Sequence, residues 1–212
     1  MKNNSYWISI SDLMSGVVGV LILFFVMAIL SIVGSQIAAE QQKQKMLEES
    51  QKGAYNVVQK LSEKHKNNTD IEFFPEEKLI RLADTSFTQG SACISNEQKI
   101  LLQQKISPEI INELSKNTNL SVQIEGHTDV TPVGSRGYSN YRACAPFDDN
   151  YTLSAGRARE ARNALFSSID RSTVNWMKRV SVVGYGADRL IDTKNPESAK
   201  NRRVEIRFIN LN

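Results

Sequence analysis

One long apolar run near the N-terminus constrains this chain more than any other feature. Residues 13–33, LMSGVVGVLILFFVMAILSIV, contain no charged side chain, and no second stretch of the 212 residues comes close to it. As a helix this run spans roughly 31 Å, which matches the hydrocarbon core of a bilayer. We therefore expect a short N-terminus over residues 1–6, one transmembrane helix over residues 7–34, and a soluble domain behind it.

A cleaved signal peptide is the alternative interpretation of the N-terminal 39 residues. Three features disfavour it: Lys2 is the only basic side chain before the apolar run, the run is longer than that of a signal peptide, and the segment Gln36–Ala39 is a poor cleavage site. Charge does not orient the span, because Lys43 and Lys45 follow it. We expect an uncleaved span whose orientation has to come from the soluble domain.

Asp12 lies at the edge of the apolar run. If Tyr6 and Trp7 anchor the helix at the membrane interface, Asp12 lies about 7 Å deeper, inside the apolar layer. Carboxylates at this depth face a protein partner or a water-filled path rather than lipid. Small residues share the same helix face, namely Ser9, Ser15, Gly16 and Gly19. From the residues alone two hypotheses stay open: an ion-carrying carboxylate, or the N-cap of a helix that begins at Leu13.

Residues 35–69 form a polar, proline-free connection between the span and the soluble domain. Apolar residues recur there at a spacing of seven, with one more on the same seam: Leu47, Ala54, Leu61 and Val58. This spacing predicts a helical linker that pairs weakly with a second copy as a coiled coil. The alternatives are a solvated single helix or a disordered linker, and Gly53 weakens any helix.

Residues 70–212 predict a single α+β domain, an α/β sandwich of ordinary domain size. We expect strands at residues 79–83, 120–125, 179–184 and 203–209, and helices at residues 95–116 and 153–168. Ser95 should cap the first of these helices, and Pro108 should break or kink it. A cap near Thr152 or Ser154 should begin the second.

The soluble domain contains both cysteines of the chain, Cys93 and Cys144. In an oxidising compartment the pair would close a long loop, which stabilises a fold by about 4 kcal/mol in the chain-entropy model. Two unlinked, buried thiols are the alternative. We expect the disulfide if the domain is periplasmic.

Several functional classes have no support in the sequence. His65 and His127 lack the neighbours of a zinc site, and the chain contains no phosphate-binding loop and no nucleophile elbow. The net charge of +3 is too small to indicate nucleic-acid binding. We expect neither an enzyme nor a cofactor.

Two sets of motifs resemble known families. The segment WISISDLMS, residues 7–15, resembles the start of the MotB and PomB family of stator subunits, in which the aspartate binds the proton or sodium ion of a motor. Four ordered strings resemble the OmpA-like peptidoglycan-binding domain: GSA at residues 90–92, IEGHTD at 124–129, NYTLSAGRA at 150–158, and GYG at 184–186 followed by NRRVE at 201–205. The second resemblance covers nearly all of residues 71–210.

The OmpA-like resemblance implies a site for the diaminopimelate of peptidoglycan, a zwitterion that needs one fixed anion and one fixed cation. It assigns the ligand ammonium to Asp129 and the ligand carboxylate to Arg157, with Thr128, Asn150 and Leu153 as walls. Without the resemblance, Asp129 would be a turn residue and Arg157 a surface charge. The loop at residues 130–149 is longer than the family pattern and would either cover the site or lie aside.

Together the resemblances imply the B subunit of an ion-driven motor in the bacterial inner membrane. They imply a homodimer inside a ring of a multi-span MotA-like or ExbB-like partner, protons or sodium as the ion, a cytoplasmic N-terminus and a periplasmic domain. With only six residues before Trp7, the layout resembles Zorya anti-phage systems more than flagellar stators. A passive wall tether without an ion path and a secreted binding module are the alternatives.

Overall fold

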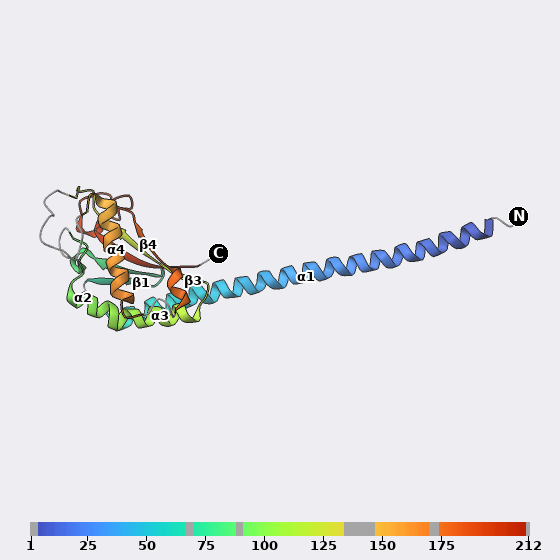
Figure 1. Cartoon of the computed structure of the whole chain (residues 1–212), viewed down its shortest axis with the longest axis horizontal. Helices are drawn as coiled ribbons and strands as arrows, with labels where there is room; N and C mark the ends of the chain where they lie inside the picture. Colours follow the sequence, from blue (N-terminus) through green and yellow to red (C-terminus); the bar gives the residue numbers. More distant parts are fainter. Residues whose placement is uncertain (1–3, 67–69, 88–90, 134–146, 170–173, 211–212) are drawn as a thin grey trace. The chain divides into compact units, whose positions relative to one another are not determined.

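The computed structural model describes residues 4–66, 70–87, 91–133, 147–169 and 174–210 (Figure 1). The chain divides into two compact units, Met1–Leu47 and Glu48–Asn212. Helix α1 (Asn4–Lys64) forms all of the described part of the first unit and contributes its last turns to the second. Each unit is described separately below.

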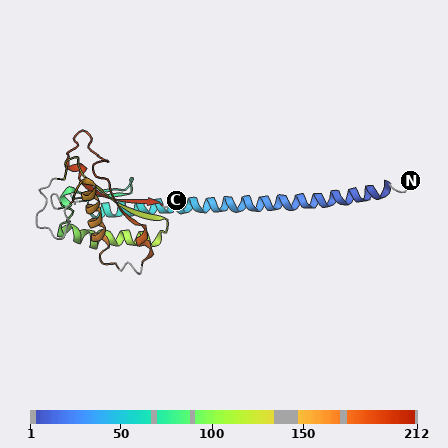
Figure 2. The ribbon, with the colours of Figure 1, turned by 45° about the horizontal axis from the view of Figure 1, so that its top comes forward.

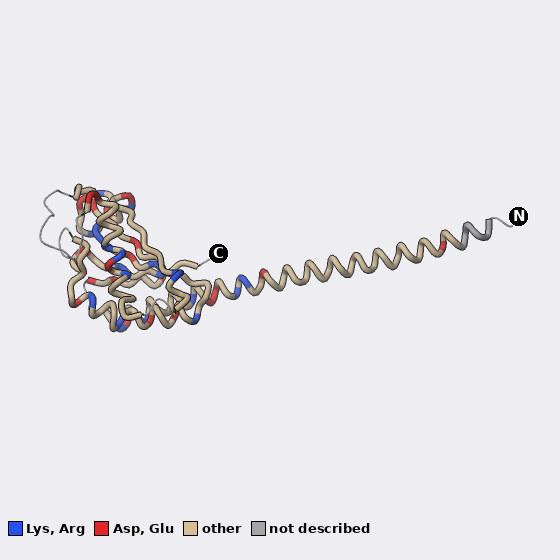
Figure 3. The backbone as a smooth tube through the Cα atoms, viewed as in Figure 1, with Lys and Arg blue, Asp and Glu red and all other residues tan. Residues whose placement is uncertain are grey.

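The first unit is a helix that is long and apolar enough to cross a membrane, with a mean hydropathy of 3.0 in its most apolar window. Figure 3 shows the long run of α1 without charged residues, and Asp12 is the only charged residue between residues 4 and 39. Because α1 begins at Asn4, Asp12 lies well inside the helix. The interpretation of Asp12 as an N-cap is therefore wrong.

The second unit is built on a five-stranded sheet with the order β1-β2-β5-β3-β4. Neighbouring strands are antiparallel except β3 and β4, which are parallel. The strands are β1 (Ile71–Phe74), β2 (Leu79–Ala83), β3 (Leu120–His127), β4 (Val180–Gly184) and β5 (Arg203–Asn210). Helix α4 (Asn150–Phe166) connects β3 to its parallel neighbour, as a parallel pair requires. The predicted mixed α+β fold is confirmed.

A second helical run precedes β3. It consists of α2 (Asn96–Leu101), a π-helical segment η2 (Leu102–Ile106) and α3 (Ser107–Lys116). As predicted, Ser95 caps α2, because its side chain accepts a hydrogen bond from the backbone N–H of Gln98. Pro108 lies in the first turn of α3, directly after η2. The interruption expected at Pro108 is therefore a widened π-helical turn rather than a break, since helical residues run without a gap from Asn96 to Lys116.

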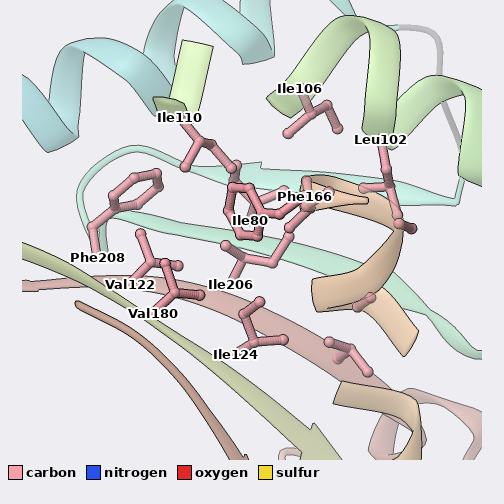
Figure 4. Packing of buried hydrophobic residues seen from close by; sticks show 14 of the residues in the cluster. Ile80, Leu102, Ile106, Ile110, Val122, Ile124, Phe166, Val180, Ile206 and Phe208 are labelled. Atoms are coloured by element: carbon pink, nitrogen blue, oxygen red, sulfur yellow. The ribbon is translucent and has the colours of Figure 1, made fainter. Parts of the chain in front are cut away.

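The hydrophobic core fills the space between one face of the sheet and the helices. Figure 4 shows strand side chains facing helical ones, and Figure 2 shows the same elements from a second direction. The labelled residues include Ile80, Val122, Ile124, Ile206 and Phe208 from the strands and Ile106, Ile110 and Phe166 from the helices, all buried. Alternate residues of the strands supply this face, as the pleat of a strand requires.

The apolar seam predicted for a two-chain coiled coil is buried within the second unit instead. Ala54, Val58 and Leu61 belong to the hydrophobic core of this unit. On the same stretch of helix, Lys60 and Lys64 form ion pairs with Glu109 of α3, with N–O distances of 2.8 and 3.0 Å. The periodicity correctly predicted a helix with one buried face, but periodicity does not identify the partner of that face. The compact unit consequently begins at Glu48, earlier than the residue 70 expected from the sequence.

The opposite face of the sheet carries charged residues. They occupy alternate positions on three adjacent strands: Arg81 on β2, Arg203, Glu205 and Arg207 on β5, and Glu125 and His127 on β3. Glu125 and Glu205 are direct cross-strand partners, a pairing of like charges that is unfavourable by itself. The three arginines bond to these two glutamates and more than offset their charge, so this face is held together by ion pairs.

Candidate functional site

The OmpA-like resemblance assigns five residues to a diaminopimelate site, called the wall site below. These residues come from two neighbouring parts of the fold. Thr128 and Asp129 follow β3, whereas Asn150, Leu153 and Arg157 lie on α4. Two glycines let α4 approach the sheet closely. A Cβ at Gly126 would overlap the backbone carbonyl of Ser154, and one at Gly184 would lie 2.7 Å from the backbone nitrogen of Ala155.

The start of α4 is fixed by a capping box at Asp149. Its carboxylate accepts a hydrogen bond from the backbone N–H of Thr152 at 2.7 Å, and the Thr152 hydroxyl accepts one from the Asp149 N–H at 3.1 Å. Hydrogen bonds from the backbone and side chain of Thr152 lower the pKa of Asp149. The predicted cap, Thr152 or Ser154, was therefore wrong by a few residues. Thr152 is the other half of the box.

This helix start also holds the loop that follows β3. The Asn150 side chain donates hydrogen bonds to the carbonyls of Asp129 and Thr131, at 3.2 and 3.1 Å. The Asp129 carboxylate accepts one from the Thr131 N–H at 3.0 Å, which makes a tight local turn. On the other side, the Thr128 N–H donates to the carbonyl of Gly186 at 2.8 Å. Asp129 is thus fixed by backbone contacts on both sides.

Asp129 and Arg157 belong to one row of four alternating charges, in which two further residues lie between them. Arg157 Nη1 is 3.0 Å from Asp84 Oδ1, Asp84 Oδ2 is 2.9 Å from Arg202 Nε, and Arg202 Nη1 is 2.7 Å from Asp129 Oδ2. Asp84 begins the short 3-10 helix η1 (Asp84–Ser86) after β2, and Arg202 directly precedes β5. The row therefore joins the ends of β2, β5 and β3 to helix α4. Its two positive and two negative formal charges cancel.

The two ends of the row are buried and its middle is more exposed. The side chains of Arg157 and Asp129 are 2% and 7% exposed, against 21% for Asp84 and 32% for Arg202. The Arg157 guanidinium donates to the carbonyl of Ser91 at 3.1 Å. Arg157 is therefore not a surface charge, and that interpretation is wrong.

Burial lowers the pKa of an arginine, whereas pairing with a carboxylate raises it, and the two effects compete at Arg157 and Arg202. Burial lowers the pKa of Arg157, and the neighbouring Asp84 carboxylate offsets this only in part. Burial also disfavours the charged form of Arg202, but its hydrogen bonds to Asp129 and Asp84 outweigh burial and raise its pKa. Both guanidinium groups remain charged at neutral pH, because arginine side chains are not deprotonated in proteins.

Three buried polar atoms at this site make no aligned hydrogen bond within the described part of the chain: Asp84 Oδ1, Arg157 Nη1 and Thr128 Oγ1. Asp84 and Arg157 are close enough for attraction but are poorly oriented for a hydrogen bond. Buried polar groups are normally satisfied, so these three atoms mark unused capacity to bind a polar ligand.

The sequence did not single out Asp84 and Arg202. Arg202 lies in the NRRVE string, but the string alone gave no reason to distinguish it from Arg203. Asp84 follows a strand, as many turn-forming aspartates do, and no motif marked it. Only the tertiary arrangement of β2, β5 and α4 brings these two charges to the site.

A second charged cluster surrounds His127 on the opposite face of the sheet. His127 Nε2 lies 3.8 Å from Glu125 Oε2 and 3.9 Å from Glu205 Oε2, and the residue is almost fully buried. The three groups have the donor types and spacing that could hold a metal ion. Both carboxylates, however, already accept hydrogen bonds from arginine side chains, so a cation would enter a site whose negative charge is already offset. We interpret this cluster as structural.

Some predicted features fall on residues that the structure does not describe. Cys93 is described, and its backbone N–H donates to the hydroxyl of Ser91 at 2.8 Å. Cys144 lies outside the described residues, as do residues 134–146 of the long loop. The disulfide between Cys93 and Cys144, and a loop that covers the site, stay predictions.

Comparison with known proteins identifies the family of this fold. A model of the OmpA family matches residues 86–203, more than half of the chain. Motility protein B of Escherichia coli K12 is 29% identical over 147 residues, 66% of this chain and 41% of that protein. The part of the chain that aligns spans between 40% and 58% of the length of the curated relatives that it matches.

Several solved structures share the fold, among them the following two. A MotB-like protein from Desulfovibrio vulgaris superposes with a TM-score of 0.54 at 19% identity, over 79% of this chain and 98% of that one. The cell wall anchor of the type VI secretion system from Pseudomonas aeruginosa gives a TM-score of 0.50 at 19% identity, over 73% and 97%. At these identities the likeness shows the fold alone.

Proposed function

This chain belongs to the OmpA family, and from that premise we propose that it anchors an ion-driven motor of the bacterial inner membrane to peptidoglycan. In this proposal the second unit binds the wall and Asp12 of α1 carries the ion. The wall-binding half rests on the row of charges at the site, and the motor half on the position of Asp12.

The observation that carries wall binding is the fixed pair of opposite charges, Asp129 and Arg157. Diaminopimelate presents an ammonium and a carboxylate on one carbon, so its site needs an anion and a cation held a short distance apart. Asp129 would accept the ammonium, and Arg157 would donate to the carboxylate with its planar guanidinium. Thr128, Asn150 and Leu153 would shape the walls. One solved structure of the same fold is that of a cell wall anchor, which agrees with this assignment.

The motor half rests on an isolated carboxylate in an apolar helix. Asp12 has no charged neighbour within α1 until Glu40. Beside it, Gly16 and Gly19 have nothing within 4 Å of where a side chain would stand in the single chain, which leaves room for a close-packed helix. We propose two copies inside a ring of a multi-span MotA-like or ExbB-like partner. One charge crossing 100 mV releases about 2.3 kcal/mol, and this flow of protons or sodium ions would drive the motor.

Wall binding also gives the orientation of the span. Peptidoglycan lies outside the inner membrane, so the second unit would be periplasmic and the N-terminus cytoplasmic. That compartment would favour the disulfide between Cys93 and Cys144. For the process served, we propose anti-phage defence of the Zorya type, with flagellar motility as the alternative. A helicase or nuclease gene beside the operon supports defence, and flagellar genes support motility.

Sedimentation with purified sacculi tests the wall-binding half. Asp129→Asn and Arg157→Gln should each reduce the bound fraction of the detergent-solubilised chain at least tenfold, because each leaves one ligand charge unmatched. Arg159→Gln is the matched control, since Arg159 is an exposed arginine on the same helix. Thermal melting separates lost binding from lost folding, which is a risk at the buried Arg157. If folded variants of both residues sediment like the parent, the site assignment is wrong.

A further inference from the structure

We infer that Asp84 and Arg202 form an internal ion pair that occupies the wall site in place of the ligand and competes with it. This inference rests on the proposed function, because it concerns the same pair of charges, Asp129 and Arg157. In this inference Asp84 and Arg202 compete with the ligand for Arg157 and Asp129, and they do not themselves bind it.

The polarity of the pair matches that of the ligand. Its anion, Asp84, faces the cation of the site at 3.0 Å, and its cation, Arg202, faces the anion of the site at 2.7 Å. The two members are joined to each other at 2.9 Å. Asp84 and Arg202 together therefore present the same two charges, in the same order, that one zwitterionic centre of diaminopimelate would present.

Burial shows which pair has to move. A ligand carboxylate would take the place of the Asp84 carboxylate, since the Arg157 side chain is 2% exposed and Asp84 is the carboxylate that faces its Nη1 at 3.0 Å. A ligand ammonium reaches Asp129 only after Arg202 withdraws, for the same reason. Asp84 and Arg202 are the more exposed members of the row, so they are the ones that can turn toward solvent.

The contact that must break is a poor one. Asp84 Oδ1 and Arg157 Nη1 lie close together without an aligned hydrogen bond, and the hydroxyl of Thr128, next to Asp129, has no partner either within the described residues. The Asp84 carboxylate is tied to a short 3-10 turn and to Arg202, which limits how it can orient. A free ligand carboxylate can align with the guanidinium, and a ligand ammonium has three donors to share between Asp129 and Thr128.

Exchange of one pair for another also predicts a requirement for both ligand charges. A zwitterion displaces Asp84 and Arg202 together, and the two can remain bonded to each other as they leave. A ligand with only one charge would displace half of the pair and leave a buried charge unmatched, which is costly. The internal pair is therefore a specificity device that admits zwitterions and rejects simple amines and simple acids.

Calorimetric titration of the whole chain in detergent with meso-diaminopimelate tests this inference by the sign of one effect. Arg202→Gln removes the competitor of the ligand ammonium, so affinity should rise about fivefold or more. The double variant Asp84→Asn/Arg202→Gln should also bind more tightly than the parent. Arg207→Gln is the matched control: Arg207 is 31% exposed and bonds two glutamates on the other face of the sheet, so its loss should leave affinity unchanged. Pimelate and pentane-1,5-diamine, which carry only one kind of charge, should not bind the parent.

Each possible result of these titrations supports or overturns the inference. A parent that binds, with a folded Arg202→Gln variant that binds equally or more weakly, overturns the competition and leaves the proposed function standing. A parent that does not bind, with an Arg202→Gln variant that does, supports the competition. If neither binds and the melts show both folded, the competition and the diaminopimelate site are both wrong.

Discussion

Gly126 of β3 lies directly against the backbone of Ser154 in α4, so close that a Cβ at Gly126 would overlap the Ser154 carbonyl oxygen. This contact sets the distance between the end of β3 and the start of α4. It therefore also sets the distance between the residues that follow Gly126 and those that follow Ser154, including Asp129 and Arg157. The glycine of the GHTD string is required by packing rather than by backbone conformation.

Gly126→Ala should lower the free energy of unfolding by about 3 kcal/mol, because the backbone of Ser154 cannot yield as a flexible side chain would. Gly34→Ala is the control, since nothing lies within 4 Å of that position in the single chain. Urea unfolding of both variants measures the difference. Equal stabilities would show that α4 can shift without cost and that the close approach is not required.

Leu61→Ala should lower the free energy of unfolding of the second unit by about 2–5 kcal/mol, since Leu61 is fully buried in its core. Leu47→Ala should cost much less, because Leu47 precedes this unit and is only partly buried. Urea unfolding at two protein concentrations provides the measurement. Stability that rises with concentration, and that falls equally in both variants, would restore the two-chain coiled coil.

His127 should make the stability of the second unit depend on pH. Burial lowers the pKa of His127, more than Glu125 and Glu205 raise it. Below the unfolded-state value of about 6.5 the unfolded chain takes up a proton that the folded chain refuses, so stability falls as the pH drops, by at most about 1.4 kcal/mol per pH unit. Urea unfolding between pH 7.5 and 5.5 should show this slope in the parent and lose it in His127→Gln. An unchanged slope in the variant would contradict the assignment.

The sequence predicted helices, strands and caps well where they depend on interactions between residues that are close in the sequence. The apolar run, the strands predicted at residues 79–83 and 120–125 and the cap at Ser95 each depend on neighbouring residues only, and each was found as expected. The seam at Ala54, Val58 and Leu61 marks the limit of such patterns. A stripe of apolar residues shows that one helix face is buried, but it contains no information on whether the covering surface is the same chain or another.

The site was predictable only in part, for a related reason. The strings around Asp129 and Arg157 indicated a site, yet the burial of Arg157 and the presence of Asp84 and Arg202 follow from how β2, β5 and α4 meet. These residues are far apart in the sequence, so no local spacing brings them together. Charged residues that pair across a fold are visible in the sequence only as isolated charges.

We propose that Asp12 carries the ion of a motor, and replacement of this one carboxylate is the sharpest test of that role. Asp12→Asn keeps the size and polarity of the side chain but removes its titratable group. Glu40→Gln is the matched control, a neutralised carboxylate of the same helix beyond the apolar run. Activity is to be measured as phage resistance or motility, together with membrane insertion and co-purification of the multi-span partner. The proposal predicts that Asp12→Asn abolishes activity with insertion and assembly intact, that Asp12→Glu is intermediate, and that Glu40→Gln is active. Full activity of a normally assembled Asp12→Asn complex would contradict the ion path and leave a passive wall tether as the better account.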